Sequence, residues 1–254
     1  MIMLTICASA RADVIKHIPT NDKVVALTFD ACEAGKPMSF DQGVLRFLLM
    51  KQLPFTIFAS GRFVETNKED VAALASLDFV DIENHSWNHP NNMNTFDPSA
   101  VLKQVERTDK LIQETTGRAP QFFRFPAGNY SARALKAVEG LGHKVVHWRW
   151  ATGDPDPHES ANALYKRVVH NVQPGDILIF HINGRGVHTA EALPRIVEYL
   201  EGEGYRFALI SDYLGRPHPH KQEPVVETTV ASARRVLDKW LTSLPLLGAA
   251  GTVN

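Results

Sequence analysis

The sequence is poor in cysteine and has no excess of charge of either sign. Its 254 residues include two cysteines, Cys7 and Cys32, so a disulfide-rich scaffold is excluded. Lys and Arg together number 27 and Asp and Glu 28, which gives a formal net charge of −1. Because no basic block interrupts this balance, nucleic acid is not an expected partner.

Long apolar runs are absent as well. No stretch approaches the ~18 consecutive apolar residues of a membrane span, so no span is expected. The first twelve residues form a short apolar run ending in Ala10-Arg11-Ala12, the small-residue pattern of a signal-peptidase site. We therefore expect a signal peptide at 1–12 and a periplasmic or secreted protein, although a basic n-region is missing and a frayed N-terminus is the alternative.

What the sequence does contain is a regular alternation of two kinds of segment. Of its residues, 44% are hydrophobic and 22% are charged, as in ordinary globular domains. Apolar, β-rich runs predict strands at 24–29, 55–59, 79–82, 121–125, 144–150, 177–180 and 206–210. Amphipathic patterns predict helices at 40–52, 69–77, 98–116, 132–141, 161–172 and 189–203.

This alternation predicts an α/β fold with parallel strands. Seven units in one chain favour a distorted (β/α)7 barrel over two small domains, and we assign it to residues 13–216. Residues 217–254 are expected to form a linker and an amphipathic C-terminal helix at 228–244. The oligomeric state is left open.

Polar side chains occur where the predicted strands end. His85 and His89 are four residues apart after the third strand, and two neutral imidazoles arriving together are typical ligands of a divalent metal such as zinc. Elsewhere in the chain, the other strand-end residues are Asp30, Arg124, Asp154 and His181. The carboxyl ends of parallel strands share one rim, so we expect all six residues to converge there.

Each of these residues also has an ordinary structural explanation. Asp30 is a common turn former, Arg124 could serve only in a structural ion pair, and His181 could be a core histidine. A buried arginine nevertheless needs a carboxylate, and Asp30 is the natural partner for Arg124. A carboxylate at Asp154 close to His181 would hold its tautomer and raise its pKa, as a general acid requires.

Taken in order, these motifs resemble the polysaccharide deacetylases with a NodB homology domain, the carbohydrate esterase 4 group. The resemblance covers about residues 24–214. The matching segments are Thr28-Phe29-Asp30-Ala31, His85-Ser86-Trp87-Asn88-His89, Arg124-Phe125-Pro126, Asp154 and Ile179-Phe180-His181. Five motifs in the family's order are a specific signal, whereas any one of them alone is weak.

The resemblance implies a mechanism and a role for each residue. The protein would remove N-acetyl groups from a carbohydrate polymer, using a divalent metal, with zinc as the expected ion. Asp30 would be the base and Arg124 the group that orients it, while His181 would be the acid, tuned by Asp154. The remaining implied roles are metal binding by His85 and His89, an oxyanion contact from the Ala127 backbone, and an acetyl pocket bordered by Ile179 and Leu178.

The sequence departs from the family pattern at two places. Ala31 replaces the aspartate that serves as the third metal ligand, and Glu33 is our candidate replacement, followed by Asp41 and the Cys32 thiolate. Alternatively, Asp30 binds the metal and Glu33 is the base. Ala127 and Pro155 replace two family aromatics, so the substitutes expected to supply a sugar-stacking face are Tyr130, Trp87, Trp148 and Trp150.

Two rival functions stay open from the sequence. One is hydrolysis of small non-peptide amides on the same scaffold. The other is a carbohydrate-binding protein that has lost catalysis, which the alanine at position 31 favours. The segment 184–188 lacks the Lys-Ser/Thr of a phosphate loop, so we interpret it as a rim loop whose Arg185 or His188 contacts substrate.

Overall fold

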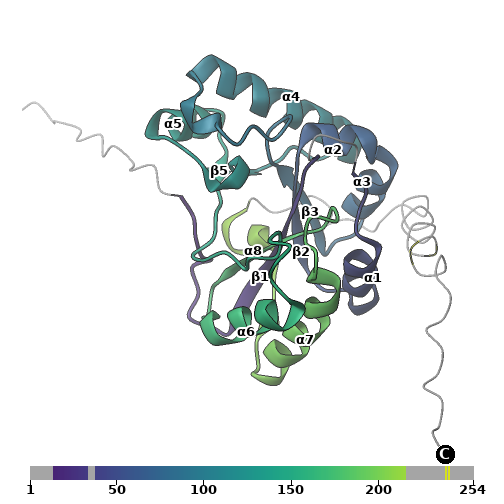
Figure 1. Cartoon of the computed structure of the whole chain (residues 1–254). Coiled ribbons are helices and arrows are strands. Elements are labelled where there is room, and N and C mark those ends of the chain that lie inside the picture. The colour runs from purple at the N-terminus through teal and green to yellow at the C-terminus, as the bar shows by residue number, and fades with distance from the viewer. Residues whose placement is uncertain (1–13, 34–37, 216–237, 239, 241–254) are drawn as a thin grey trace, which may run out of the picture.

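A parallel sheet lies at the centre of the computed structural model, which describes residues 14–33, 38–215, 238 and 240 (Figure 1). The strands are β1 (Val24–Ala31), β2 (Phe55–Ala59), β3 (Val80–Asn84), β4 (Phe122–Phe123), β5 (Lys144–Val145), β6 (Ile177–His181) and β7 (Arg206–Phe207). Their order is β5-β4-β3-β2-β1-β6, and β7 pairs with the start of β1. The predicted α/β fold with parallel strands is confirmed.

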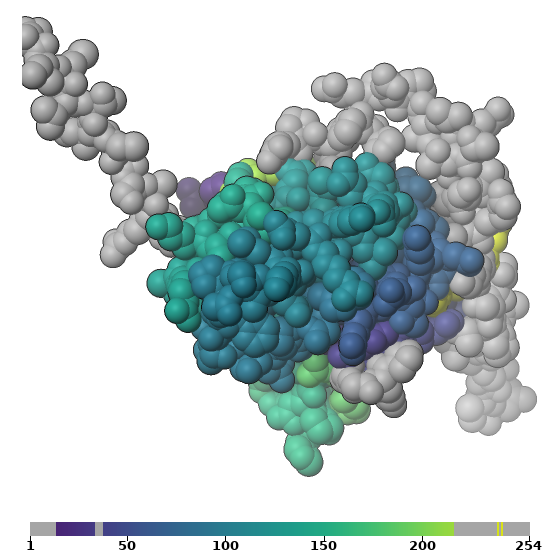
Figure 2. Space-filling model, turned by 90° about the horizontal axis from the view of Figure 1, so that it is seen from above, coloured from purple at the N-terminus to yellow at the C-terminus, as the bar shows by residue number. Residues whose placement is uncertain are grey.

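Helices surround this sheet and cover its outer face (Figure 1). They are α1 (Gln42–Lys51), α2 (Gly61–Thr66), α3 (Lys68–Ala75), α4 (Pro98–Thr116), α5 (Ala132–Gly140), α6 (Ala161–Asn171), α7 (Thr189–Gly202) and α8 (Ile210–Leu214). Most begin at a residue whose side chain accepts a backbone N–H, as Asp97 does for α4. Viewed from above, the blue-to-teal part of the chain, which includes α4, covers one end of the molecule (Figure 2).

Several predicted boundaries were wrong for identifiable reasons. The strand predicted at 144–150 ends at Val145, because the N–H of Val146 makes the last bond to β4 and the N–H of His147 bonds to Ile15 of the N-terminal segment. The strand predicted at 206–210 ends at Phe207, and Ile210 begins the unpredicted helix α8. Helix α2 was also missed, since six residues are too few to establish a helical period.

The two edges of the sheet are joined by the N-terminal segment of the described chain. Ile15 forms a parallel bridge with Val146 beside β5, and His17 bridges Asp176 just before β6. The N–H of Ile18 also donates to the carbonyl of Gly175 at 2.8 Å. The predicted (β/α)7 barrel is therefore a half-barrel, and residues 14–18 span the gap between β5 and β6.

Alternation along β1 decides which side chains face the site. Leu27, Phe29 and Ala31 pack in the main apolar core with α1 and α7. Thr28 and Asp30 point to the opposite face of the sheet, because successive side chains of a strand alternate. All eight residues of β1 are buried, so the carboxylate of Asp30 lies at the end of a fully covered strand.

Two predictions lie outside the described residues. These are the signal peptide at 1–12 and, apart from Asp238 and Trp240, the linker and helix at 217–254. Trp240 is buried, and its ring meets that of Phe40 edge to face with centroids 6.3 Å apart. In the described part of the chain, no helix has the length and apolarity that crossing a membrane requires.

Candidate active site

The centre of the site is a buried ion pair between the ends of β1 and β4. Nη1 of Arg124 donates to Oδ1 of Asp30 at 2.8 Å, and Arg124 is wholly buried. Burial by itself raises the pKa of Asp30, but the positive charge around it, with the Arg124 guanidinium in direct contact, outweighs burial and brings this pKa down to about 2. Asp30 is therefore an ionised carboxylate at neutral pH.

Arg124 is fixed on every side by groups that orient its guanidinium. Its Nη2 donates to the hydroxyl of Thr28 at 3.0 Å, and its Nε donates to the carbonyl of Val146 at 3.3 Å. The guanidinium also lies over the ring of Phe58, 4.0 Å from the centroid. An arginine held in this way presents a fixed donor to Asp30 and limits the carboxylate to one orientation.

His85 presents an unused lone pair to the same space. Its Nδ1 donates to the carbonyl of Arg124 at 2.8 Å, and because a carbonyl can only accept, Nδ1 carries the ring proton. Its Nε2 is buried without a hydrogen-bond partner and lies 3.4 Å from Oδ2 of Asp30. Burial lowers the pKa of His85, so the ring is neutral and two acceptor atoms face each other.

His89 reaches the same space through a strained turn. The rings of His85 and His89 have centroids 4.9 Å apart. Ser86 and His89 have φ values of 67° and 53°, in the left-handed region that non-glycine residues rarely adopt. Burial and the neighbouring His85 lower the pKa of His89 to about 3, so this ring is also neutral.

Strained backbone is concentrated at this site. Of the four non-glycine residues with positive φ among those described, Ser86, His89 and Ala127 all belong to it. Ala127 lies in the turn after Arg124, with φ 53° and ψ 16°. Strain of this kind costs about 1–3 kcal/mol per residue and persists where surrounding contacts enforce it, often at functional sites.

A second pair stands opposite the first, at the end of β6. Nδ1 of His181 donates to Oδ1 of Asp154 at 2.9 Å, and the His181 backbone N–H donates to Oδ2 at 2.6 Å. The hydroxyl of Thr189 donates to the same Oδ2 at 2.8 Å. Burial alone would lower the pKa of His181, but the charge and hydrogen bond of Asp154 outweigh it and raise this pKa above the ordinary histidine value.

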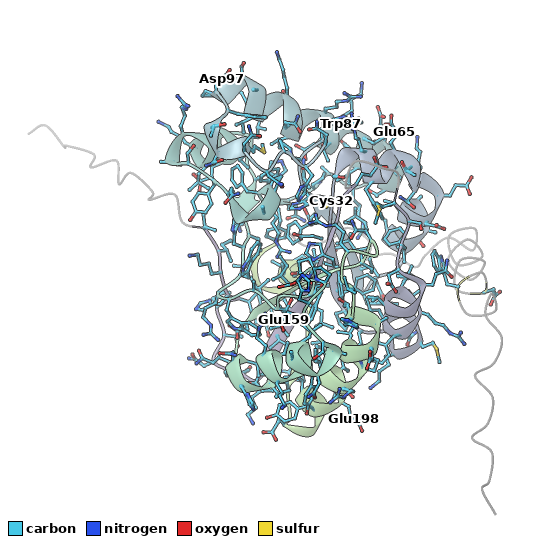
Figure 3. All side chains as sticks on the ribbon, viewed as in Figure 1. Cys32, Glu65, Trp87, Asp97, Glu159 and Glu198 are labelled. Carbon is cyan, nitrogen blue, oxygen red and sulfur yellow. The ribbon has the colours of Figure 1, made fainter. Side chains whose placement is uncertain are left out.

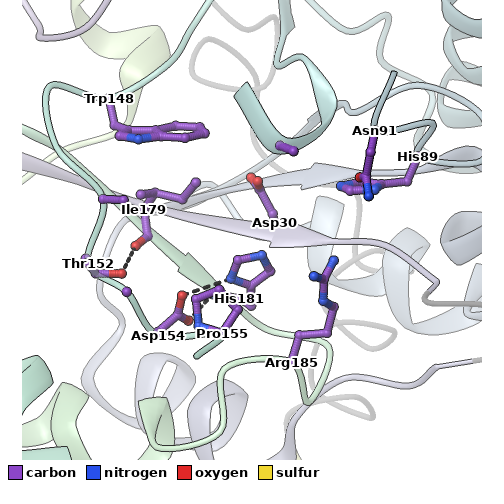
Figure 4. Close-up of a pocket in the computed structure, with 13 residues that line it drawn as sticks. Asp30, His89, Asn91, Trp148, Thr152, Asp154, Pro155, Ile179, His181 and Arg185 are labelled. Atoms are coloured by element: carbon purple, nitrogen blue, oxygen red, sulfur yellow. Dashed lines mark hydrogen bonds and ion pairs between the residues drawn. The ribbon is translucent and has the colours of Figure 1, made fainter. Parts of the chain in front are cut away.

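One cavity of about 260 Å³ connects the two pairs (Figure 4). Its walls include Asp30, His89, Ala127, Asp154, Ile179, His181 and Arg185, with Asn91, Trp148, Thr152 and Pro155 completing much of the rim. Arg124 and His85 do not line the cavity. Arg124 contacts its wall by donating to Asp30, and His85 is held next to Arg124 by the hydrogen bond to the Arg124 carbonyl. An ionised carboxylate and a histidine of raised pKa in one cavity are typical of general acid–base chemistry.

Some residues predicted for the site lie elsewhere. Glu33 accepts a hydrogen bond from Thr66 at 2.7 Å and does not line the cavity. Asp41, its second-choice replacement, caps α1. Within residues 14–33 and 38–215, no group of three His, Cys, Asp or Glu side chains is placed to hold a metal. The third ligand predicted to compensate for Ala31 is thus not brought to the two imidazoles.

The predicted substrate pocket is also changed in part. Ile179 and Ala127 line the cavity, but Leu178 packs in the core because it points to the other face of β6. Tyr130 is 37% exposed and packs on Phe125 beside the cavity without lining it. Of the four aromatics expected to offer a stacking face, Trp148 alone is among the lining residues.

Cys32 lies in the interior of the molecule, whereas Asp97 and Glu198 lie at its periphery (Figure 3). Its thiol accepts a hydrogen bond from Nη1 of Arg185 at 3.3 Å. Burial raises the pKa of the thiol, which disfavours the thiolate that a zinc ligand requires.

Sequence reasoning missed the residues that support the charged pairs. Thr28 was passed over, although its position two residues before Asp30 places both on one face of β1. Thr189 could not be linked to Asp154, because that contact depends on how the loop before α7 folds back. His147 stacks on Trp148 with ring centroids 5.2 Å apart, and burial lowers its pKa to about 3.

Comparison with known proteins identifies the family to which this geometry belongs. The sequence profile described as polysaccharide deacetylase matches residues 17–146. A peptidoglycan-N-acetylglucosamine deacetylase of Bacillus cereus is 30% identical over 210 residues, which cover 80% of this chain and 93% of the relative. The chain therefore belongs to the polysaccharide deacetylase family.

Solved structures of carbohydrate esterase family 4 share the fold. A family 4 acetyl xylan esterase from Clostridium thermocellum, in complex with a cobalt ion, is 26% identical with a TM-score of 0.67 and covers 75% of this chain and 90% of its own. A family 4 pseudoenzyme from Bacillus anthracis is 24% identical with a TM-score of 0.70, covering 80% of this chain and 69% of its own. The half-barrel described above is thus the NodB-like fold.

Proposed function

We propose that this chain is an active deacetylase that removes N-acetyl groups from amino sugars in a carbohydrate polymer. The observation that carries the proposal is that one cavity is lined by a carboxylate that stays deprotonated, Asp30, and a histidine that favours its protonated form, His181. Asp30 has a pKa lowered to about 2, while the pKa of His181 is raised above its ordinary value. Amide hydrolysis needs both a proton acceptor for the attacking water and a proton donor for the leaving amine.

The residues divide these tasks by position. Asp30 accepts the proton of the attacking water, and Arg124 keeps its carboxylate turned toward the cavity. His181 donates a proton from Nε2 to the departing amine while Asp154 holds Nδ1. Ala127 and Ile179 both line the cavity, so the backbone N–H of Ala127 is our candidate donor to the developing oxyanion and Ile179 our candidate apolar wall for the acetyl methyl group.

A divalent cation fits two of the residues present. The buried, unpartnered Nε2 of His85 and the neutral ring of His89 are suitable nitrogen ligands, and the Arg124 carbonyl fixes the His85 tautomer. The negative charge of Asp30 at 3.4 Å from Nε2 would stabilise a cation between them. Such a cation, zinc by its ligand type, would polarise the acetyl carbonyl and lower the pKa of a water from 15.7 to about 7.

Metal analysis together with acetate release tests the proposal. We expect purified protein to retain about one divalent cation per chain and to release acetate from an N-acetylglucosamine oligomer. His85→Ala and His89→Ala should each lose the ion, because one imidazole and one carboxylate do not hold zinc in a protein site. The matched control is His143→Ala, whose ring bonds to Asp109 away from the cavity. Full ion retention by both site variants would refute the ligand assignment.

The role of Asp154 gives a pH prediction. The raised pKa of His181 keeps its ring protonated to higher pH, and activity should decline as the pH rises through that pKa. Asp154→Asn removes the charge responsible, so the alkaline limb of the kcat/KM profile should move down by about 1–3 pH units. Thr189→Val, which removes one hydrogen bond to Asp154 but keeps its charge, should shift the limb by less. An alkaline limb unmoved by Asp154→Asn would assign the proton donor to another group.

Catalytic inactivity is the second candidate, and a specific observation favours it. Ala31 replaces an expected ligand, and the described residues bring no third His, Cys, Asp or Glu to the imidazole pair. A carbohydrate-binding protein with this site would bind N-acetylglucosamine oligomers saturably, retain no stoichiometric metal and release no acetate. The experiments above therefore separate the two functions.

A further inference from the structure

The charges that line the cavity do not all have partners. Asp30 is paired with Arg124 and Asp154 with His181. Arg185, from the loop between β6 and α7, also lines the cavity, but it makes no ion pair with any acidic group of the described chain. Its hydrogen-bond acceptor is the thiol of Cys32, which is weak and uncharged at neutral pH.

The loop that carries Arg185 is held firmly in place. The N–H of Val187 donates to the carbonyl of Asp154 at 3.1 Å, and the side chain of Asn183 donates to the carbonyl of Cys32. Gly186 permits this approach, because a Cβ there would lie 2.6 Å from Oδ2 of Asp154. In Figure 4 the guanidinium of Arg185 points toward the space that Asp30, His89 and His181 also face.

We infer that Arg185 forms an anion subsite, and that the substrate is an N-acetylated sugar bearing a carboxylate or phosphate close to its acetamido group. This inference rests on the proposed function, because it places the sugar in the same cavity. Arginine binds planar oxyanions through paired donors, and such charge-assisted hydrogen bonds are about twice as strong as neutral ones. The fixed loop means that little ordering is needed when the anion binds.

The proximity of the subsite to the acid and base restricts the substrate further. Arg185 and His181 are four residues apart and line one cavity of about 260 Å³. A volume of this size holds roughly one sugar unit, so the anion belongs to the sugar that carries the acetamido group or to its immediate neighbour. A neutral homopolymer of N-acetylglucosamine would leave the guanidinium without a counter-charge.

Equilibrium binding measured by calorimetry tests the subsite independently of turnover. The probes are N-acetylglucosamine tetramer as the neutral ligand, an N-acetylmuramic acid disaccharide as the carboxylate and N-acetylglucosamine 6-phosphate with its unphosphorylated parent as the phosphate pair. We expect the full-length protein to bind one anionic probe about tenfold or more tightly than its neutral counterpart at low salt. The preferred probe identifies carboxylate or phosphate as the anion, and added salt should reduce the preference.

Variants at position 185 then test whether Arg185 is responsible for the preference for the anionic probe. Arg185→Gln should reduce the anionic-to-neutral affinity ratio to about one, and Arg185→Lys should retain part of it because a point charge remains. Arg133→Gln removes an equal charge from an exposed position on α5 and should keep the full ratio. Equal affinity for anionic and neutral probes in the wild-type protein, or a ratio unaffected by Arg185→Gln, would overturn the subsite. An intact ratio without acetate release would instead refute the proposed function alone.

Discussion

Replacing Asp30 by asparagine (Asp30→Asn) is expected to lower kcat for acetate release by about 10²- to 10⁴-fold. The amide has nearly the same shape as the carboxylate, but it cannot accept the proton of the attacking water. His85 and His89 are unchanged in this variant, so the protein should still retain its cation. Steady-state kinetics on an N-acetylglucosamine oligomer and elemental analysis of the same preparation measure both quantities.

The matched control for this experiment is Asp176→Asn. Asp176 is also buried and also paired with an arginine, since Arg149 donates to both of its oxygens at 2.9 and 2.8 Å. It does not line the cavity, and its variant should therefore keep kcat within a few fold. Should Asp30→Asn lose the cation together with turnover, Asp30 would be a metal ligand and the proton acceptor would have to be sought elsewhere.

Replacing Arg124 by methionine (Arg124→Met) is expected to cost about 3–5 kcal/mol of the free energy of unfolding. The substitution preserves most of the side-chain volume but leaves the buried carboxylate of Asp30 without the positively charged guanidinium that pairs with it. Urea denaturation monitored by circular dichroism measures the loss. The double variant Asp30→Asn/Arg124→Met leaves no charge behind and should recover a large part of it, and a double variant as unstable as Arg124→Met would contradict this explanation.

The same pair sets how stability depends on pH at the acidic end. The pKa of Asp30 is about 2 in the folded protein against 3.8 for the free group. A carboxyl whose pKa is lowered on folding contributes stability that is complete above 3.8 and is lost as the pH falls through about 2. In Arg124→Met burial is less opposed and this pKa rises, so protonation of Asp30 costs the folded variant less stability, and the difference in unfolding free energy between variant and wild type should shrink as the pH falls through this range.

The sequence was sufficient to predict the parallel sheet and the strand ends at which polar residues are placed. Asp30 and Arg124 were predicted as partners because a buried arginine needs a carboxylate, and the structure joins them at 2.8 Å. His181 and Asp154 were likewise predicted to lie together, and they do. In both cases the partner could be predicted because one residue needs a carboxylate beside it: the buried arginine for its charge, and the histidine for its tautomer.

The parts of the site that could not be predicted depend on contacts between residues distant in sequence, or on which of two adjacent strand residues faces the cavity. Leu178 and Ile179 are adjacent and both apolar, so composition could not decide which of them faces the cavity. Glu33 is close to Asp30 in sequence, but its side chain bonds to Thr66 after the strand has ended. The role of residues 14–18 was also unpredictable, because their pairing with both sheet edges depends on where those edges lie.

Residues 14–18 link the two edges of the sheet, and the two sides of the cavity are attached to these edges. Trp148 follows β5 on one side, and His181 ends β6 on the other. These five residues therefore brace the cavity from outside, although none of them lines it. A proteolytic cut just before Val14 would leave this link whole, whereas a cut a few residues further on would release it and let Trp148 and His181 move apart.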